Sequence, residues 1–286
     1  MGEAATPERR RPPPSRHAII NADDFAFTSA VTAGIVEAHT SGIVTSTSMM
    51  VHCPGWDDGV RRARATPTLD VGLHFNLLVG APRSAAPSLR GPDGEFLSLR
   101  ALVRNALLGH IRARDVAEEC EAQLSALYQA GIRVTHMDSH RHTHALPVIR
   151  GAVARVAAAR GLPLRRPLES HWWFLRDGAS QWHRALIACS WRTASLAAPS
   201  TRAPDHFVGV SLQYGHAFRA RLEHVLATLS PGTTEIMVHP GYVDDALVAL
   251  DGYTGQREVE RLALVDPSLR AHLMRHNVAL TNFNAL

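Results

Sequence analysis

The sequence predicts an α/β protein whose parallel strands curl into a TIM-barrel-like (β/α) barrel, distorted or with seven strands. Short runs of β-branched residues alternate with helical patterns through most of the chain, giving about seven or eight strands. Titratable residues follow several of these strands, as expected where the carboxyl ends of parallel strands meet. Because no repeat or linker divides the sequence, we expect one domain over residues 17–286. A doubly wound open sheet is the alternative.

The composition is that of an ordinary globular protein, with 45% hydrophobic and 20% charged residues among 286. All 30 basic residues are Arg, which excludes Schiff-base chemistry and phosphate-loop mechanisms that need a lysine. The net charge of +4 comes largely from arginines before residue 17, so a nucleic-acid partner is not indicated.

Residues 1–16 are rich in Pro, Arg and Glu, which predicts a disordered tail and not a signal peptide. The three cysteines are widely spaced and form no C-x-x-C pair, which is typical of reduced thiols. Reduced thiols predict a cytoplasmic location. No run of 18 apolar residues is present, so we expect no membrane span.

The first predicted strand, residues 17–22, leads directly into Asp23 and Asp24. Two adjacent carboxylates at the end of an apolar strand are costly unless a cation or a proton compensates them. The alternative is a helix N-cap, since residues 29–40 look helical and Asp favours that position. Gly42 would then end this helix.

The next third of the chain predicts a strand at residues 43–51, a helix at 54–65 and a strand at 69–75. His74 stands at the end of the last of these, where a histidine in the core would be the ordinary explanation if it stood alone. Residues 78–108 contain many Pro, Gly and Ser residues and predict a long irregular insertion, which is often functional.

The clearest helix covers residues 115–130. Asp115 and Glu118 resemble a capping box, and Gly131 follows the last turn. An apolar stripe at helical spacing predicts the buried face. Its members are Val116, Cys120, Leu124 and Leu127.

A histidine-rich run follows, with a ligand-type side chain at every second position. These side chains are His136, Asp138, His140, His142 and His144. In an extended backbone all five would face one side. Imidazole and carboxylate are ligands for divalent metals, but a catalytic site typically uses about three of them. A surface histidine tract that binds metal only by accident is the alternative.

The second half of the chain continues the strand and helix alternation. Helices are predicted at 147–160, 218–229, 254–264 and 266–275, and strands at 163–166, 206–211, 235–238 and 278–280. His239 follows the strand at 235–238. Residues 169–198 hold Trp172, Trp173, Trp182 and Trp191, which predict either core packing or flat surfaces for sugar rings.

Four predicted strand ends therefore carry ligand-type residues, and a parallel barrel would bring them to one mouth. One carboxylate and two imidazoles leave coordination positions open for water. A second carboxylate can take a proton from that water, and a histidine can protonate a leaving group. This set favours metal-assisted hydrolysis. A non-haem iron oxygenase, a metal-dependent phosphodiesterase and a binding module without turnover are the alternatives.

Five segments together resemble the YdjC/ChbG-like carbohydrate deacetylases, including the hopanoid-biosynthesis-associated branch. They are residues 21–25 (NADDF), 42–48 (GIVTSTS), 72–77 (GLHFNL), 135–144 (THMDSHRHTH) and 238–241 (VHPG). The resemblance runs from about Ile19 to near the C-terminus, with the segments in the order of the family. It implies a TIM-barrel-like fold, a divalent metal and removal of acetyl groups from N-acetylated sugars.

The resemblance also implies roles for particular residues. Asp24, His74 and His140 would hold the metal, zinc or magnesium first and manganese or cobalt as alternatives. Asp23 would be the general base and His239 the general acid. The remaining candidates, expected to contact the substrate or the metal ligands, are Asn76, His136, Asp138, His142 and His144. A homodimer is a further expectation.

One position departs from the family pattern. Ala26 stands where the family usually has Gly after Asp-Asp-Phe. Residues 162–204 match nothing that indicates a substrate. Chitooligosaccharides, glycolipids and aminoglycoside-type natural products therefore all remain candidates.

Overall fold

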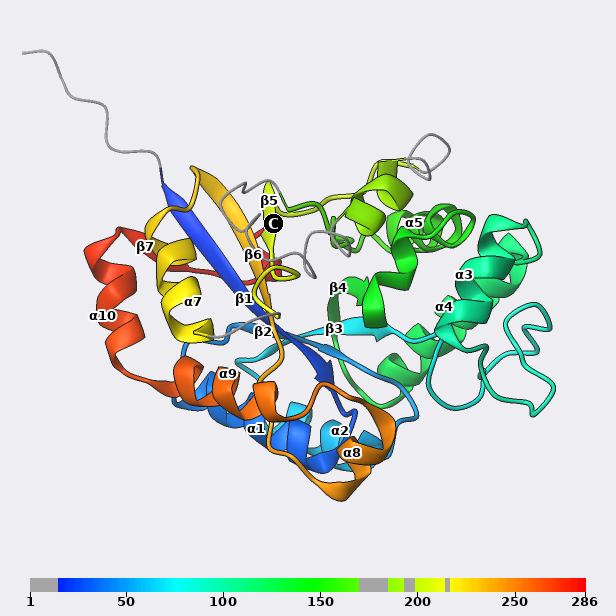
Figure 1. Cartoon of the computed structure of the whole chain (residues 1–286), viewed down its shortest axis with the longest axis horizontal. Helices are drawn as coiled ribbons and strands as arrows, with labels where there is room; N and C mark the ends of the chain where they lie inside the picture. Colours follow the sequence, from blue (N-terminus) through cyan, green and yellow to red (C-terminus); the bar gives the residue numbers. More distant parts are fainter. Residues whose placement is uncertain (1–14, 170–184, 193–198, 214–216) are drawn as a thin grey trace, which may run out of the picture.

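The computed structural model describes residues 15–169, 185–192, 199–213 and 217–286. A parallel sheet forms its centre, with the strand order β4-β3-β2-β1-β6-β5 and β7 beside β1 (Figure 1). The strands are β1 (Arg16–Phe25), β2 (Ser46–Met49), β3 (Asp70–Phe75), β4 (Val134–Ser139), β5 (His206–Val208), β6 (Gly232–Val238) and β7 (Val278–Leu280). The sheet curls into a half-barrel, which confirms the predicted α/β class and the distorted TIM-barrel-like fold.

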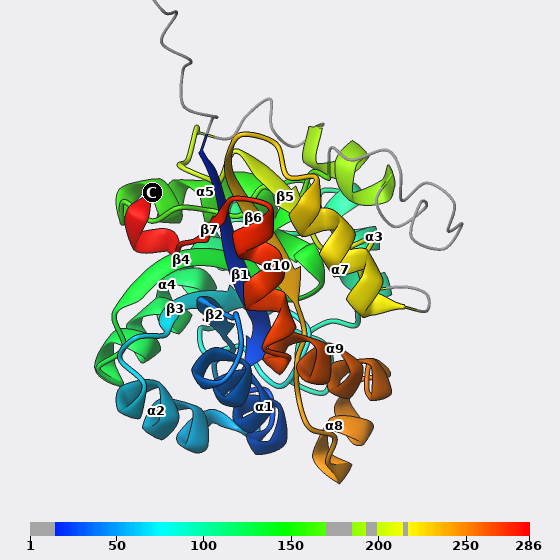
Figure 2. The same cartoon turned by 90° about the vertical axis from the view of Figure 1, so that its left-hand side faces the viewer.

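Helices surround the curled sheet (Figure 2). They are α1 (Ser29–Thr40), α2 (Trp56–Ala65), α3 (Leu99–Leu107), α4 (Ala113–Gln129), α5 (Ile149–Ala159), α7 (Phe218–Ala227), α8 (Asp245–Leu250), α9 (Gly255–Val265) and α10 (Ser268–Arg275). Short 3-10 segments cover His140–Ala145 and Phe283–Ala285. Neighbouring helices pack side by side, as α1 does with α2 and α9, and α4 with α5. None of the helices in the described ranges has the length and apolar character needed to span a membrane.

The long strand β1 is the axis of the sheet. It pairs with β6 along one edge, and with β7 and then β2 along the other. The pairing starts at Arg16, so the tail predicted over residues 1–16 is too long by this residue; residues 1–14 lie outside the described residues. The first strand is thus longer than the apolar pattern predicted, because a strand paired on both edges extends beyond its apolar residues.

Residues 163–169 lie across the open side of the sheet. Leu164 forms a parallel bridge to Met137 of β4, and Glu169 forms another to Phe207 of β5. The strand predicted at 163–166 is therefore only an isolated bridge. The segment still connects the two edge strands β4 and β5.

Several predicted boundaries differ from the structure. The second strand is shorter than predicted. The supposed irregular insertion contains α3, which Ser98 caps by accepting from Ala101 N at 3.4 Å. The capping box was wrong, because α4 starts at Ala113 and Asp115 instead accepts from Ser88 N at 2.8 Å. The predicted apolar stripe of α4 is confirmed, since all four residues are buried.

Two of the sequence observations have a local explanation. Helix α1 ends at Thr40 and its C-cap is Ser41, so the prediction that Gly42 ends this helix was wrong. A Cβ at Gly42 would lie 2.3 Å from the Leu264 carbonyl oxygen, so glycine permits this close approach. Trp191 is buried, which confirms core packing for that residue. The three other tryptophans, Trp172, Trp173 and Trp182, lie outside the described residues.

Ala26 has a left-handed backbone, with φ of 66°. This conformation favours glycine, which explains why glycine is usual at this place in the family that the chain resembles. The methyl group fits because Gly59 of α2 has no side chain, and a Cβ there would lie 2.5 Å from that of Ala26.

Gly72 of β3 provides a test of the packing beneath the site. A Cβ at this position would lie 2.5 Å from the buried ring of His136. We expect Gly72→Ala to lower the free energy of unfolding by about 1–3 kcal/mol, the usual cost of overpacking. Gly255→Ala is the matched control, because a Cβ at that position would meet nothing within 4 Å. Chemical unfolding that gives both variants the stability of the parent would contradict this explanation.

Candidate active site

The end of strand β1 is distorted, and the distortion turns Asp23 and Asp24 toward one cavity. In a regular strand, adjacent side chains point to opposite faces. Here Asp24 has a φ of 69°, and the pairing with β2 shifts register at this point. Such irregularities re-aim side chains beside active sites. Both carboxylates line the same cavity, and the N-cap of α1 is Thr28, so the alternative role of these aspartates as caps is wrong.

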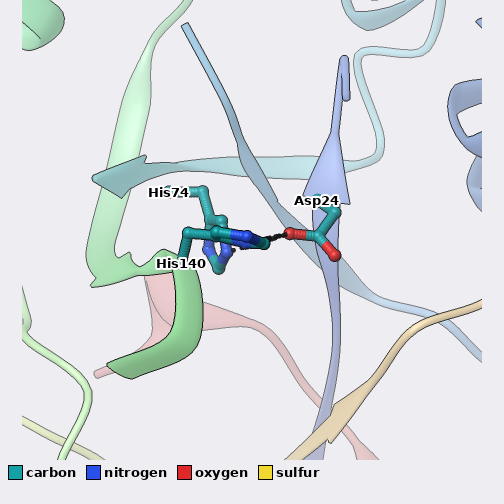
Figure 3. A group of neighbouring side chains, drawn as sticks. All are labelled: Asp24, His74 and His140. Atoms are coloured by element: carbon teal, nitrogen blue, oxygen red, sulfur yellow. Dashed lines mark hydrogen bonds and ion pairs between the residues drawn. The ribbon is translucent and has the colours of Figure 1, made fainter. Parts of the chain in front are cut away.

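Asp24, His74 and His140 form a compact buried group at the carboxyl end of the sheet (Figure 3). Asp24 Oδ1 lies 3.2 Å from His74 Nε2 and 2.9 Å from His140 Nδ1. One possible ligand atom from each residue lies within 4.8 Å of the others. A carboxylate and two imidazoles suit a divalent ion and leave positions for water. The donor set therefore fits the metal that the sequence led us to expect.

Asp138 of β4 orients His74 from behind. Its Oδ1 lies 2.6 Å from His74 Nδ1, which leaves His74 Nε2 directed toward Asp24. Metal-binding histidines commonly donate their second N–H to a carboxylate in this way. Burial lowers the pKa of His74, but the carboxylates of Asp138, Asp23 and Asp24 outweigh it and raise the pKa to about 10. The pocket around His74 thus favours positive charge.

Arg165 is fully buried among three carboxylates. It binds both oxygens of Asp23 at 2.6 and 2.7 Å, Asp138 at 2.8 Å and Glu235 at 2.7 Å. Burial raises the pKa of Asp23, but the guanidinium outweighs it and holds that pKa well below its usual range. Burial also raises the pKa of Glu235, to about 7. Asp23 and Asp138 form a second possible donor group with His74, but Arg165 contacts both of these carboxylates and Asp138 already contacts His74 Nδ1, so we take the Asp24 group as the candidate cation site.

Arg257 of α9 holds the other oxygen of Asp24. Its Nη2 lies 2.7 Å from Asp24 Oδ2 and 3.0 Å from Asp251, which also binds Arg141 at 2.9 Å. Burial raises the pKa of Asp24, but Arg257 and His140 outweigh it and hold the pKa well below its usual range. Asp24 is therefore an ionised carboxylate that turns one oxygen to the guanidinium and the other to the two histidines.

His239 follows β6 and lines the same cavity. Gln213 Nε2 lies 3.2 Å from its Nε2, and the ring of Tyr253 packs edge-on with centroids 5.5 Å apart. The His239 backbone N–H donates to Glu260 at 2.6 Å, and this carboxylate also accepts from the Tyr253 hydroxyl. Burial lowers the pKa of His239 to about 4, although Asp23 and Asp24 act in the opposite direction. Its imidazole is thus neutral at pH 7.

The cavity has a volume of about 420 Å³. This volume is within the range of small-molecule sites. The predicted base, acid and metal ligands all contribute to its walls. Other described residues in the walls include Arg141, His142, Gln213, Tyr253 and Arg257.

The histidine-rich run is extended only as far as Ser139. A 3-10 segment follows, in which Arg141 and His142 have φ of 52° and 53°. The prediction that all five ligand-type side chains face one side is therefore wrong, because the backbone leaves the strand after Ser139. His140 and His142 line the cavity, whereas His136 and His144 do not.

His136 lies in the interior beneath the site. Its Nε2 is 3.0 Å from Asn21 Oδ1, and its ring stacks on Phe283 with centroids 3.7 Å apart. Asn21 in turn donates to Asp23 at 2.8 Å. Burial and Arg165 hold the pKa of His136 well below its usual range, so it is a neutral packing residue that reaches Asp23 only through Asn21.

His144 and Asn76 are also framework residues. His144 Nδ1 lies 2.5 Å from Ser139 Oγ, and its Nε2 lies 3.1 Å from the Arg165 carbonyl oxygen. Asn76 Oδ1 accepts from the backbone of residues 78 and 79, and its Nδ2 donates to residue 79. Neither residue lines the cavity, so the structure gives no support to contact with the substrate.

Sequence reasoning missed Arg165 and Arg257, the two buried cations of the site. Arginine is ordinarily a surface residue, and α9 looks amphipathic with Arg257 among other charged residues. The only signal for Arg165 is its place beside an apolar Leu-Pro-Leu run. Their partners are 142 and 233 residues away in the chain, and a local sequence pattern cannot predict contacts over such separations.

The histidine and aspartate cluster at the carboxyl end of this curled parallel sheet could hold a metal ion, and it lies where the active sites of such folds are found. The chain belongs to the YdjC-like protein family, whose model matches residues 17–275. The resemblance noted from the sequence is thereby confirmed.

Relatives cover nearly the whole chain. A protein of Brevibacillus brevis named carbohydrate deacetylase is 33% identical over 94% of this chain and 98% of its own length. One of Geobacillus stearothermophilus with the same name is 32% identical over 94% and 97%. A solved structure from Enterococcus faecalis, described as a putative cellobiose-phosphate cleavage protein, is 26% identical, covers 95% of this chain and 98% of its own, and has a TM-score of 0.75.

Replacing Arg165 tests its role among the carboxylates. We expect Arg165→Met to lower the free energy of unfolding by about 3–5 kcal/mol, because it leaves buried carboxylates without a counter-charge. Arg166→Met is the matched control, since the neighbouring side chain is exposed. Denaturant unfolding measures both. Equal stability of the two variants would show that the buried ion pairs contribute nothing.

A comparison of two histidines in the 3-10 segment tests which of them binds the metal. His140 and His142 are equally buried, but only His140 belongs to the group around Asp24. We expect His140→Ala to abolish stoichiometric binding of a divalent metal and His142→Ala to retain it, as measured by elemental analysis of purified protein. Full metal content in His140→Ala would remove His140 from the ligand set.

Proposed function

We propose that the protein is a metal-dependent N-deacetylase that hydrolyses the acetamide of an N-acetylated amino sugar in an oligosaccharide, a glycolipid or a glycosylated natural product. The observation that carries this proposal is the convergence of Asp24, His74 and His140 beside the ionised carboxylate of Asp23 in one cavity. The names of the relatives give the proposal its substrate class.

Asp24, His74 and His140 would hold one divalent ion. When bound, the ion supplies Lewis acidity for the amide carbonyl and lowers the pKa of a water molecule. Zinc is the first candidate, because imidazole ligands suit it better than magnesium, which prefers oxygen donors. Manganese and cobalt remain to be compared in the assay.

Asp23 would act as the general base. Arg165 keeps it ionised at neutral pH and fixes the orientation of both oxygens. The same guanidinium makes Asp23 a weak base, so it can accept a proton only from a water whose acidity has been raised. Deprotonation of the water would therefore require both Asp23, to accept the proton, and a bound ion, to make the water more acidic.

His239 would act as the general acid toward the departing amine. Because burial keeps its ring neutral at pH 7, His239 has to receive its proton within the catalytic cycle. Asp23 and Asp24 favour its protonated form, which supports transfer of the proton taken from water. Gln213 and Tyr253 hold the ring toward the cavity meanwhile.

Release of acetate tests the proposed function. Purified protein is stripped of metal, resupplied with zinc, magnesium, manganese or cobalt, and incubated with saccharides and glycoconjugates that contain N-acetylglucosamine. Metal-dependent acetate release supports the proposal. Phosphate release from phosphodiesters, or oxygen consumption with iron, in place of acetate would favour the rival activities with the same ligand set.

The role of the base predicts a separation of binding from turnover. We expect Asp23→Asn to retain the metal and to lose acetate release by about 10²–10⁴-fold, the range for general acid–base catalysis. Asp24→Asn is the comparison, because it should lose both metal and turnover. An Asp23→Asn enzyme with full activity would exclude Asp23 as the base.

A further inference from the structure

Arg150, near the start of α5, is a buried cation without a counter-charge among the described residues. Arg150 is only 8% exposed, and neither its Nε nor its Nη1 has a hydrogen-bond partner among the described residues. The guanidinium stacks on Trp191, 3.2 Å above the ring centroid. Leaving buried donors unsatisfied is costly, and more so for a charged group. Within the part of the chain that the structure describes, nothing compensates this charge.

A cavity of about 460 Å³ opens onto Arg150. Two more arginines, Arg166 and Arg192, line it, as do the hydroxyl residues Ser200 and Thr201. The described lining residues include no carboxylate. We call this space the arginine cavity. Three guanidinium groups with hydroxyl donors and no acid form a surface for an anion.

The arginine cavity is separate from the active site. The two share no lining residue among those described. Residues 163–169 lie between them, since Leu164, Arg166 and Leu168 face the arginine cavity. Arg165, on the opposite side of the same segment, reaches Asp23. Alternation of side chains along an extended backbone explains this division.

The electrostatics of the cavity favour an anion of more than one charge. Burial and the neighbouring Arg166 lower the pKa of Arg150 to about 10, so Arg150 is still protonated at pH 7. The like charges destabilise each other until an anion binds. A phosphate monoester carries up to two negative charges and three acceptor oxygens, so it can accept from more than one guanidinium at a time, which a carboxylate with one charge and two oxygens does less well.

We propose that the arginine cavity binds the phosphate group of a small soluble ligand, outside the catalytic site. The volume of the cavity exceeds the needs of inorganic phosphate and lies in the range for small metabolites. Arg150 anchors the phosphate, Arg166 and Arg192 surround it, and Trp191 holds the anchor in place by stacking. The proposal does not depend on the reaction catalysed in the other cavity.

Calorimetric titration with inorganic phosphate and with a hexose phosphate tests the proposal. We expect saturable binding at one site, and a loss of affinity of at least about tenfold in Arg150→Met, because a charge-assisted bidentate contact is removed. Arg155→Gln, an exposed arginine of the same helix, is the matched control and should bind as the parent does. Since phosphate also coordinates divalent metals, each titration is repeated after chelation, and the binding should survive.

Thermal unfolding provides a second readout, which also reports the stability of the phosphate-free protein. Removing an unpaired buried charge should leave the stability of the phosphate-free protein unchanged or higher in Arg150→Met. Phosphate should then raise the melting temperature of the parent and of Arg155→Gln, but not of Arg150→Met. The proposal is overturned by phosphate binding that Arg150→Met retains, by no binding in the parent, or by binding only to vesicles of phosphatidic acid.

Discussion

The buried guanidinium of Arg165 is the interaction on which fold and site both depend. It binds Asp23 of β1, Asp138 of β4 and Glu235 of β6, and so ties three strands across the interior of the curled sheet. Without it, these carboxylates would have to take up protons or water. The residue stands where the sheet has only isolated bridges, so the ion pairs supply the connection that regular strand pairing does not. The fold and the orientation of Asp23 therefore depend on the same ion pairs.

Around the cavity, buried carboxylates outnumber the guanidinium groups that contact them, and this favours a cation. Asp23, Asp24, Asp138 and Glu235 are buried carboxylates, whereas Arg165 and Arg257 are the guanidinium groups that contact them. The excess of negative groups lies next to His74 and His140, where donor atoms converge. Arg257 binds only one oxygen of Asp24 and leaves the other directed toward the histidines. The carboxylate oxygen of Asp24 that faces the two histidines would attract a cation to this place.

Much of the fold could be predicted from the sequence, because the spacing of apolar residues indicates which faces are buried. Polar residues that follow predicted strands indicate where the site lies. Helix α1 has the predicted bounds, and the three proposed ligands meet as the parallel topology requires. The sequence could not show where β4 ends, since the alternation of histidines continues into a 3-10 segment. Nor could it show that the neighbours Asp23 and Asp24 share a cavity, which depends on the left-handed backbone at Asp24.

The long separations between ion-pair partners have a consequence for the order of folding. Asp23 meets Arg165 only across 142 residues of chain, and Asp24 meets Arg257 across 233. Closing such loops is slow compared with forming local contacts. During synthesis the two aspartates emerge from the ribosome long before either arginine. The ion pairs that fix Asp23 and Asp24 therefore cannot all form until α9 has been made.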